Sequence, residues 1–407
     1  MIIRTLRALL VALCLLGVTA CGPTDALRAA PASTRLSYWR VETPLIFSER
    51  DVPRVAVRAN GRAGEMLLDT GFFASLVSPE LVADAKLPAR PTRLRTVDGA
   101  GAVRPLLGIA TIDALTITDG ASGGPSGHAG RGATATFAVE SVVQDIAILR
   151  GQNDPLIGAL GLAVFRDVLL TLDYPANRLR IERGELPPAN GDDILPMKVN
   201  DQGQPLVELR LGHRRMWVMM DTGYSSGLGL PNWARSRVPG AQNATPGMPF
   251  TYYHGRGTRP IDRARIDDDL HLGWHVIHRP IADIGLSSVP VIGSDYLRHF
   301  AITFDQANGR VRFRRSATAA ITVPPIVEPG FYVDPATATI IAVVPKSGAA
   351  LADLRVGDRL VQLEGLPFAT YRATPAPRAL RPGQVSLIYE RKGKQASAVV
   401  PITTLVP

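Results

Sequence analysis

The sequence predicts a mainly β protein in which one lobe occurs twice and a different β-rich domain follows. Glycine and proline are frequent, at 38 and 33 of the 407 residues, which favours turns and short strands over long helices. Hydrophobic residues make up 46% and charged residues 20%, as in folded globular proteins. One pattern of apolar runs and turns occurs twice, and the length allows two or three domains.

The duplication is clearest in two segments, AGEMLLDTG at 63–71 and RMWVMMDTG at 215–223. Each contains a short apolar run, typical of a buried strand, that leads into a tight Asp-Thr-Gly turn. By chance this tripeptide would occur roughly 0.1 times in a chain of this length, from average residue usage. Two occurrences in equivalent settings therefore indicate a shared function.

The parallel continues downstream of each turn. DPLIGALG at 154–161 corresponds to VPVIGSDYL at 289–297, and a pair of strands with a turn at an asparagine follows each. We therefore expect two copies of one β unit, joined by a proline-containing linker. The two copies are residues 36–185 and 192–316.

Residues 325–404 have a different pattern. They contain GFYV at 330–333, SGAA at 347–350 and VGD at 356–358, and they resemble a PDZ domain of the kind found in bacterial peptidases. The resemblance implies that a C-terminal peptide adds a strand to a sheet edge and that its carboxylate binds backbone N–H groups. The residues expected in this carboxylate loop are Gly330, Phe331, Tyr332 and Val333. A role as a lid or spacer is the alternative.

With its two Asp-Thr-Gly turns, the chain resembles the pepsin/retropepsin clan over nearly all of its mature length. It is most similar to bacterial members with two copies and a C-terminal PDZ domain. The resemblance implies two pepsin/retropepsin-like β-barrel lobes, with Asp69 and Asp221 as the catalytic pair. Gly71 and Gly223 would bring the backbone beneath the carboxylates. Thr70 and Thr222 would hydrogen-bond across the lobe interface.

Two facing aspartates suit peptide hydrolysis without a metal or cofactor. Carboxylates held about 3 Å apart cannot both ionise, so they share one proton. One acts as general base on a water molecule while the other protonates the substrate oxygen, and neither role belongs permanently to Asp69 or Asp221. Since one chain supplies both groups, a monomer acting on a peptide or protein substrate is expected.

Two further features bear on this interpretation. Hairpin tips with Gly99 and Gly101 in the first lobe, and with Gly255 and Gly257 in the second, are candidate flaps over the substrate, and plain surface turns are the alternative. Pepsin-like enzymes place a small residue after Asp-Thr-Gly, where this chain has Phe72 and Tyr224. These aromatic side chains either pack beneath the site or narrow it. A non-catalytic peptide-binding scaffold is therefore the alternative function.

Residues 1–20 are expected to be a targeting segment. Arg4 and Arg7 precede a short apolar stretch, and the segment ends in LGVTAC, with the cysteine at position 21. This run resembles a bacterial lipobox, which implies lipidation of Cys21 and a tether at 21–35. Gly22 after the cysteine indicates a bacterial outer membrane, with the protein facing the periplasm. An ordinary signal peptide is the alternative.

Composition also excludes several classes of function. Once Cys14 leaves with the signal, Cys21 is the last cysteine, which excludes disulfides, thiolate metal sites and cysteine catalysis in the mature domains. The net charge of +9 falls to +7 without Arg4 and Arg7 (9 − 2 = 7), and it is spread along the chain. A nucleic-acid partner is therefore not expected, whereas weak attraction to anionic surfaces is.

Two rival sites are weaker. His271, His275 and His278 lie near three aspartates at 267–269, but in a strand His278 would point away from the other two. A solvated strand edge is favoured over a metal site. No Gly-x-Ser-x-Gly elbow supports a serine hydrolase.

Overall fold

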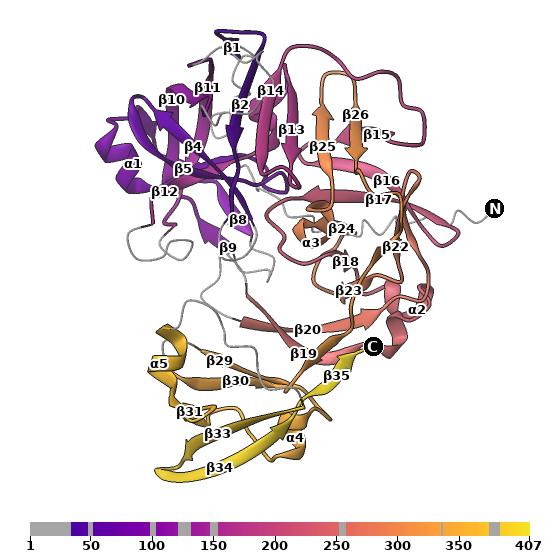
Figure 1. The fold of residues 1–407 in the computed structure, drawn as a ribbon. Coiled ribbons are helices and arrows are strands. Elements are labelled where there is room, and N and C mark those ends of the chain that lie inside the picture. Colours follow the sequence, from indigo (N-terminus) through magenta and orange to yellow (C-terminus); the bar gives the residue numbers. More distant parts are fainter. Residues whose placement is uncertain are drawn as a thin grey trace, which may run out of the picture.

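The computed structural model describes residues 34–47, 52–97, 103–120, 132–146, 154–251, 258–334, 337–373 and 383–407. They form two β-rich lobes, a sheet between the lobes and a smaller C-terminal β domain (Figure 1). The predicted mainly β class with two pepsin-like lobes is confirmed. The signal segment 1–20, Cys21 and most of the tether at 21–35 lie outside the described residues. Within the described part, no helix is long and apolar enough to cross a membrane.

The first lobe is a nine-stranded sheet with one small hairpin beside it. Its elements are β1 (Arg35–Leu36), β3 (Ile46–Phe47), β4 (Pro53–Ala59), β5 (Arg62–Leu68), β6 (Ser75–Val77), α1 (Pro79–Asp84), β7 (Ala89–Arg90), β8 (Arg95–Val97), β9 (Val103–Pro105), β10 (Gly108–Thr118), β11 (Thr134–Val143), β12 (Leu156–Leu160) and the 3₁₀ turn η2 (Leu162–Phe165). Burial alternates along β4, with Val55 and Val57 inside and Arg58 outside. This period of two places one face of the strand in the core.

The second lobe repeats this arrangement. Its elements are β16 (Pro205–Leu211), β17 (Arg214–Asp221), β18 (Leu228–Leu230), α2 (Ala234–Arg237), the 3₁₀ turn η3 (Ala241–Asn243), β19 (Thr245–Thr251), β20 (Thr258–Arg265), β21 (Leu270–Leu272), β22 (His275–His278), β23 (Ile281–Ile284), β24 (Val291–Gly293), α3 (Ser294–Leu297) and β27 (Ile321–Thr322).

Six antiparallel strands join the lobes. Their order is β2 (Arg40–Pro44), β14 (Arg178–Glu182), β13 (Leu169–Asp173), β25 (Ala301–Asp305), β26 (Arg310–Arg314) and β15 (Ile194–Val199). They form one end of a sixteen-stranded sheet, which continues from β15 into β16 of the second lobe. The strands β13 and β25 come from corresponding positions of the two copies, and Thr171 faces Thr303 with 2.9 Å between their hydroxyl oxygens. The strand pairs that sequence predicts after each apolar-apolar-Gly element are therefore present, and they meet at the centre of the molecule.

Each lobe threads a strand through the loop that follows its Asp-Thr-Gly turn. β12 runs parallel to β5 and antiparallel to β6, and β24 has the same relation to β17 and β18. Gly158 and Gly293 make this crossing feasible, since a Cβ on either would lie 2.1 or 2.2 Å from a backbone oxygen of the surrounding loop. The two sequence repeats therefore have the same strand topology around their Asp-Thr-Gly turns.

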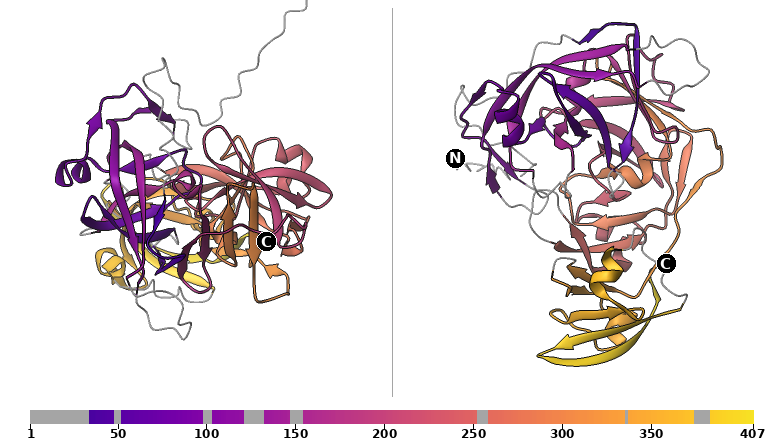
Figure 2. Two further views of the ribbon diagram at one scale, coloured as in Figure 1. Left: turned by 90° about the horizontal axis from the view of Figure 1, so that it is seen from above. Right: turned by 60° about the vertical axis from the view of Figure 1, so that its left-hand side comes forward.

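The C-terminal domain is a sheet of order β29-β30-β31-β33-β34 with two short helices. Its elements are β28 (Ile326–Glu328), β29 (Phe331–Asp334), β30 (Thr339–Val343), α4 (Gly348–Leu351), β31 (Arg359–Leu363), β32 (Leu366–Pro367), α5 (Phe368–Ala373), β33 (Gln384–Arg391), β34 (Lys394–Pro401) and β35 (Thr403–Val406). It extends from the second lobe, beyond β19 and β20 (Figure 2).

One expectation for this domain needs correction. Only Gly330 of the predicted carboxylate loop precedes the sheet, with a φ of +82°, whereas Phe331, Tyr332 and Val333 belong to strand β29. Phe331 and Val333 pack against the domain core, while Tyr332 packs against the buried cluster shared with the second lobe. Side chains that point alternately to two sides are typical of a strand and not of a loop.

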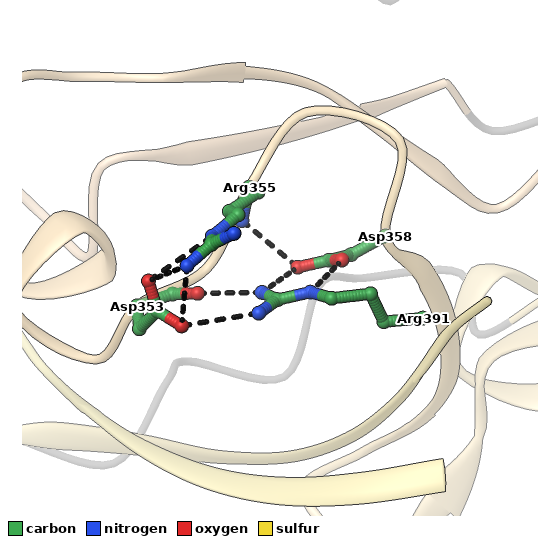
Figure 3. Close-up of polar contacts among 4 residues, drawn as sticks. All are labelled: Asp353, Arg355, Asp358 and Arg391. Atoms are coloured by element: carbon green, nitrogen blue, oxygen red, sulfur yellow. Dashed lines mark hydrogen bonds and ion pairs between the residues drawn. The ribbon is translucent and has the colours of Figure 1, made fainter. Parts of the chain in front are cut away.

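The predicted turn at 356–358 is held by ion pairs (Figure 3). The Arg391 guanidinium donates to both oxygens of Asp358 at 2.7 Å, and the backbone N–H of Arg355 donates to Asp358 at 2.8 Å. Arg391 also contacts Asp353 at 3.1 Å. Because Asp358 is buried, these bonds satisfy a carboxylate that water cannot reach.

Candidate active site

The two predicted aspartates lie at the ends of corresponding strands, where the lobes meet. Asp69 follows the last residue of β5, and Asp221 is the last residue of β17. In both strands three buried apolar residues, 66–68 and 218–220, directly precede the aspartate and anchor the turn to the core. The structure therefore brings together the two residues that sequence predicts to form a pair.

Reciprocal threonine bonds hold the two turns together. Thr70 N–H donates to Thr222 Oγ1 at 3.0 Å, and Thr222 N–H donates to Thr70 Oγ1 at 3.1 Å. The Thr70 hydroxyl donates to Met220 O at 2.7 Å, and the Thr222 hydroxyl donates to Leu68 O at 2.5 Å. Both threonines are buried, so four bonds across the lobe interface fix the distance between the turns.

The turn glycines lie beneath the opposite carboxylates. A Cβ on Gly71 would lie 2.2 Å from Cγ of Asp221, and a Cβ on Gly223 would lie 2.6 Å from Cγ of Asp69. Glycine is required at both positions because each carboxyl group closely approaches the backbone of the other lobe.

Each carboxyl group accepts hydrogen bonds from its own turn. Gly71 N–H donates to Asp69 Oδ1 at 3.1 Å, and the N–H groups of Gly223 and Tyr224 donate to Asp221 Oδ1 at 2.8 and 3.0 Å. The charge of Asp69 raises the pKa of Asp221, so the two carboxyl groups lie close enough to titrate as a pair. Two carboxyl groups placed in this way favour a state in which they share one proton.

Burial raises the pKa of both aspartates. It raises the pKa of Asp69 to about 6, against the hydrogen bonds donated to its carboxylate. Burial and the charge of Asp69 together raise the pKa of Asp221 well above its ordinary range. Both side chains nevertheless keep partial solvent exposure, so the pair is sheltered but accessible.

The aromatic residues after the two turns have different surroundings. Phe72 is half-buried beside Phe73, with ring centroids 4.7 Å apart, against an apolar cluster of the first lobe. Tyr224 is buried, and its hydroxyl donates to Asp283 Oδ2 at 2.6 Å. Arg263 donates to the other oxygen of Asp283. Tyr224 therefore packs beneath the second turn rather than narrowing the site.

Sequence reasoning missed several supporting residues. Ser294 Oγ donates to Thr222 O at 2.7 Å, and Gln204 donates from the second lobe to Gly71 O at 2.5 Å. The buried Tyr174 hydroxyl lies near Ser294 and Asp221, and burial raises its pKa. Ser294 directly follows the matched Val-Ile-Gly element, so the repeat itself was a signal for this residue. Gln204 and Tyr174 have no comparable local signal.

The candidate flaps are antiparallel hairpins, β8 with β9 and β19 with β20. Their predicted tips, with Gly99, Gly101, Gly255 and Gly257, lie outside the described residues. The flap role of these glycines therefore stays a prediction.

The histidine-rich segment forms ordinary strand contacts. His278 Nδ1 pairs with Asp269 Oδ1 at 2.8 Å, and His275 Nε2 lies 3.1 Å from Phe313 O. Among the described residues, no group of three or more His, Cys, Asp or Glu side chains is arranged to hold a metal ion.

No family model and no curated protein matches the sequence. Similar solved structures include conglutin gamma, a basic 7S globulin from lupine seeds, at 14% identity and a TM-score of 0.40, covering 69% of this chain and 96% of that one. Basic 7S globulin from soybean is similar at 15% identity and 0.40, covering 69% and 95%. A retropepsin-like aspartic protease from Rickettsia conorii shows 14% identity and 0.25, covering 30% of this chain and 89% of that one. At these levels, function has to be inferred from the geometry of the two turns.

Proposed function

We propose that the protein is an aspartic endopeptidase in which Asp69 and Asp221 activate water. The observation that supports this most strongly is the meeting of the two Asp-Thr-Gly turns, in which each carboxyl group lies against the glycine of the other turn and reciprocal threonine bonds hold the lobes together. A scaffold has no need to bring two half-buried carboxyl groups together, and their mutual repulsion costs stability.

The chemistry follows from the shared proton. The ionised carboxylate takes a proton from a water molecule as the water oxygen adds to the peptide carbonyl carbon. The protonated carboxyl group gives its proton to the carbonyl oxygen, which yields a gem-diol. The C–N bond then breaks as one carboxyl group protonates the leaving nitrogen and the other takes a proton from the diol. The aspartates end in their starting protonation state.

The raised pKa values set the expected working range. Hydrolysis needs the pair of carboxyl groups to hold one proton. The pair reaches this state when it loses its first proton, as pH rises through the lower of its two pKa values. Because burial raises the pKa of Asp69 to about 6 and the pKa of Asp221 is also raised well above its ordinary range, activity should rise between pH 5 and 7. An optimum near pH 3 would contradict this expectation.

The test uses the full-length protein in detergent with a mixed peptide library from pH 3 to 8, and the products are identified by mass spectrometry. Asp69→Asn and Asp221→Asn serve as matched variants. We expect cleavage by the wild type and a loss of at least 1,000-fold in each variant. Equal cleavage by a variant, or none by the wild type, would overturn the proposal. Peptide binding without cleavage would favour the scaffold.

For the C-terminal domain we propose a PDZ-like role in binding a C-terminal peptide. Two features support it: β29 lies at one edge of the sheet, and Gly330, with positive φ, directly precedes this strand. Added backbone pairing along β29 is the contact expected for such a ligand. Fluorescence anisotropy with free-carboxylate and amidated peptides tests this, and equal affinity for both would contradict it.

We further propose that a lipid on Cys21 anchors the protein in the bacterial envelope, at the outer membrane and facing the periplasm. The LGVTAC run at the end of the targeting segment supports this. Labelling with a radioactive fatty acid should mark the wild type and leave Cys21→Ala unmarked. Equal labelling of both proteins would contradict the anchor.

A further inference from the structure

The C-terminal domain docks on a specific part of the second lobe, the hairpin of β19 and β20. A buried apolar cluster joins the two domains, and its members are Met248, Ile261, Val344, Leu405 and Val406. Polar contacts flank it, since Thr245 donates to Leu405 O and Arg265 Nε donates to Pro407 O. This hairpin is also the candidate flap of the second lobe.

A polar chain runs from this hairpin to the turn that carries Asp221. Arg263 lies in β20 directly opposite Asp283 of β23, and its guanidinium donates to Oδ1 of that buried carboxylate. Tyr224 donates to Oδ2 of Asp283 at 2.6 Å, and its backbone N–H donates to Asp221 at 3.0 Å. Arg263 also donates to Ser226 Oγ at 3.3 Å, on the far side of the same turn. Both ends of the turn are thus tied to one strand of the hairpin.

The same strand faces the docked domain. On its other side Arg263 pairs with Thr245, whose hydroxyl bonds to Leu405 O. Arg263 also lies near Tyr332 of β29, where its charge opposes the rise in the pKa of Tyr332 that burial and Glu328 cause. An apolar connection runs in parallel, because Leu286 packs against both the docking cluster and the cluster around Tyr224.

We propose that Arg263 and Tyr224 are positioning residues through which docking of the C-terminal domain sets the turn that carries Asp221. A ligand or partner that displaces this domain would then loosen one half of the catalytic pair and leave the other half in place. The proposal deepens the peptidase proposal and rests on it for its effect on catalysis. The mechanical coupling itself is measurable without activity.

The test uses Leu405→Asp, which places a charge in the docking cluster and should detach the C-terminal domain from the second lobe. Leu405 belongs to the docking cluster and not to the core of the C-terminal domain, so that domain retains its own packing. Hydrogen–deuterium exchange of the full-length protein is followed by mass spectrometry at residues 222–226, with residues 70–74 of the first lobe as the internal control. We expect exchange at 222–226 to accelerate at least tenfold and exchange at 70–74 to stay unchanged.

Tyr224→Phe tests whether the coupling runs through the Tyr224 hydroxyl, which this variant removes. It also gives the second turn the residue that the first turn has at position 72. In this background Leu405→Asp should accelerate exchange at 222–226 less than threefold. The matched control is Tyr296→Phe, which removes a buried hydroxyl that bonds only to Ile281 of β23. It should leave the tenfold response intact.

Three outcomes overturn the proposal: no response of 222–226 to undocking, an equal response in both lobes, or an undiminished response in Tyr224→Phe. If the protein cleaves peptides, Leu405→Asp should also lower kcat at least fivefold with little change in KM. A protein that shows the exchange response and cleaves nothing would refute the peptidase proposal alone.

Discussion

The two Asp-Thr-Gly turns have the same sequence and the same hydrogen bonds to each other, yet the protein supports them differently. Behind Asp69 the chain places Phe72, which rests on apolar neighbours of its own lobe. Behind Asp221 it places Tyr224, which is tied to the buried Asp283 and Arg263. The features that hold the proposed catalytic pair together are the same in both turns. The contacts that can link the pair to another domain belong to the second turn.

The largest effect is expected where the two turns are alike. Gly71→Ala and Gly223→Ala would each place a methyl group within 2.2 to 2.6 Å of the opposite carboxyl carbon. Because small displacements of reacting groups cost about 100-fold in rate, each variant should lose at least that factor in kcat. Peptide cleavage and circular dichroism of both variants check this. A strong loss in one variant and none in the other would break the symmetry of the pair.

The next effect should appear in the second lobe. Arg263→Met leaves Asp283 buried without its cation, a change that costs about 3–5 kcal/mol of unfolding free energy. Tyr224→Phe removes a single hydrogen bond to a charged group and should cost about 1.5–3 kcal/mol. Urea unfolding of both variants tests whether Arg263→Met lowers the unfolding free energy more than Tyr224→Phe does. Equal costs would mean that Asp283 stays solvated and that the contrast between the turns is smaller than we infer.

The symmetric part of the site could be predicted from sequence, and the asymmetric part could not. Apolar runs before each turn and apolar-apolar-Gly elements after it are local patterns, so the strands and the pairing of Asp69 with Asp221 follow from them. The contact between Tyr224 and Asp283 spans 59 residues, and the contacts of Asp283 depend on the register of β23 with β18 and β20. No local pattern fixes such a register, and in sequence Asp283 is an ordinary polar residue in a short strand.

The C-terminal domain illustrates the same limit. Its strands and its turn at 356–358 are predictable, whereas the docking face is not, because Tyr332 and Leu405 look like ordinary strand residues. The assignment of Phe331 to Val333 to a loop failed for a related reason. Glycine at 330 marks the start of a turn, but it does not say where the following strand begins.

A medium-sized effect should come from the threonines. Thr70→Val and Thr222→Val each remove a hydroxyl that donates one buried hydrogen bond and accepts another. Two buried bonds correspond to about 2–3 kcal/mol, and the reciprocal arrangement predicts equal losses for the two variants. The four bonds are distinct but hold the same two turns together, so the double variant should lose less than the sum, because either single variant already loosens that contact. Unequal single losses would show that the asymmetry of the lobes reaches the threonine bonds.

The smallest effect concerns pH and tests whether the two carboxyl groups are electrostatically equivalent. A pKa raised in the folded state means that the folded protein holds the proton more tightly, so stability is lost as pH rises from 3.8 to about 6. Asp69→Asn and Asp221→Asn should therefore stabilise the protein at pH 7.5, by roughly 1–2 kcal/mol or a few degrees in Tm, because both side chains keep partial exposure. The gain should vanish near pH 3.5, where the wild-type pair is protonated in both states. Because the two groups titrate as a pair, both variants should gain at pH 7.5. Thermal melts at both pH values check this. A gain in one variant alone would show that the two turns differ electrostatically, and no gain at pH 7.5 would contradict the raised pKa values.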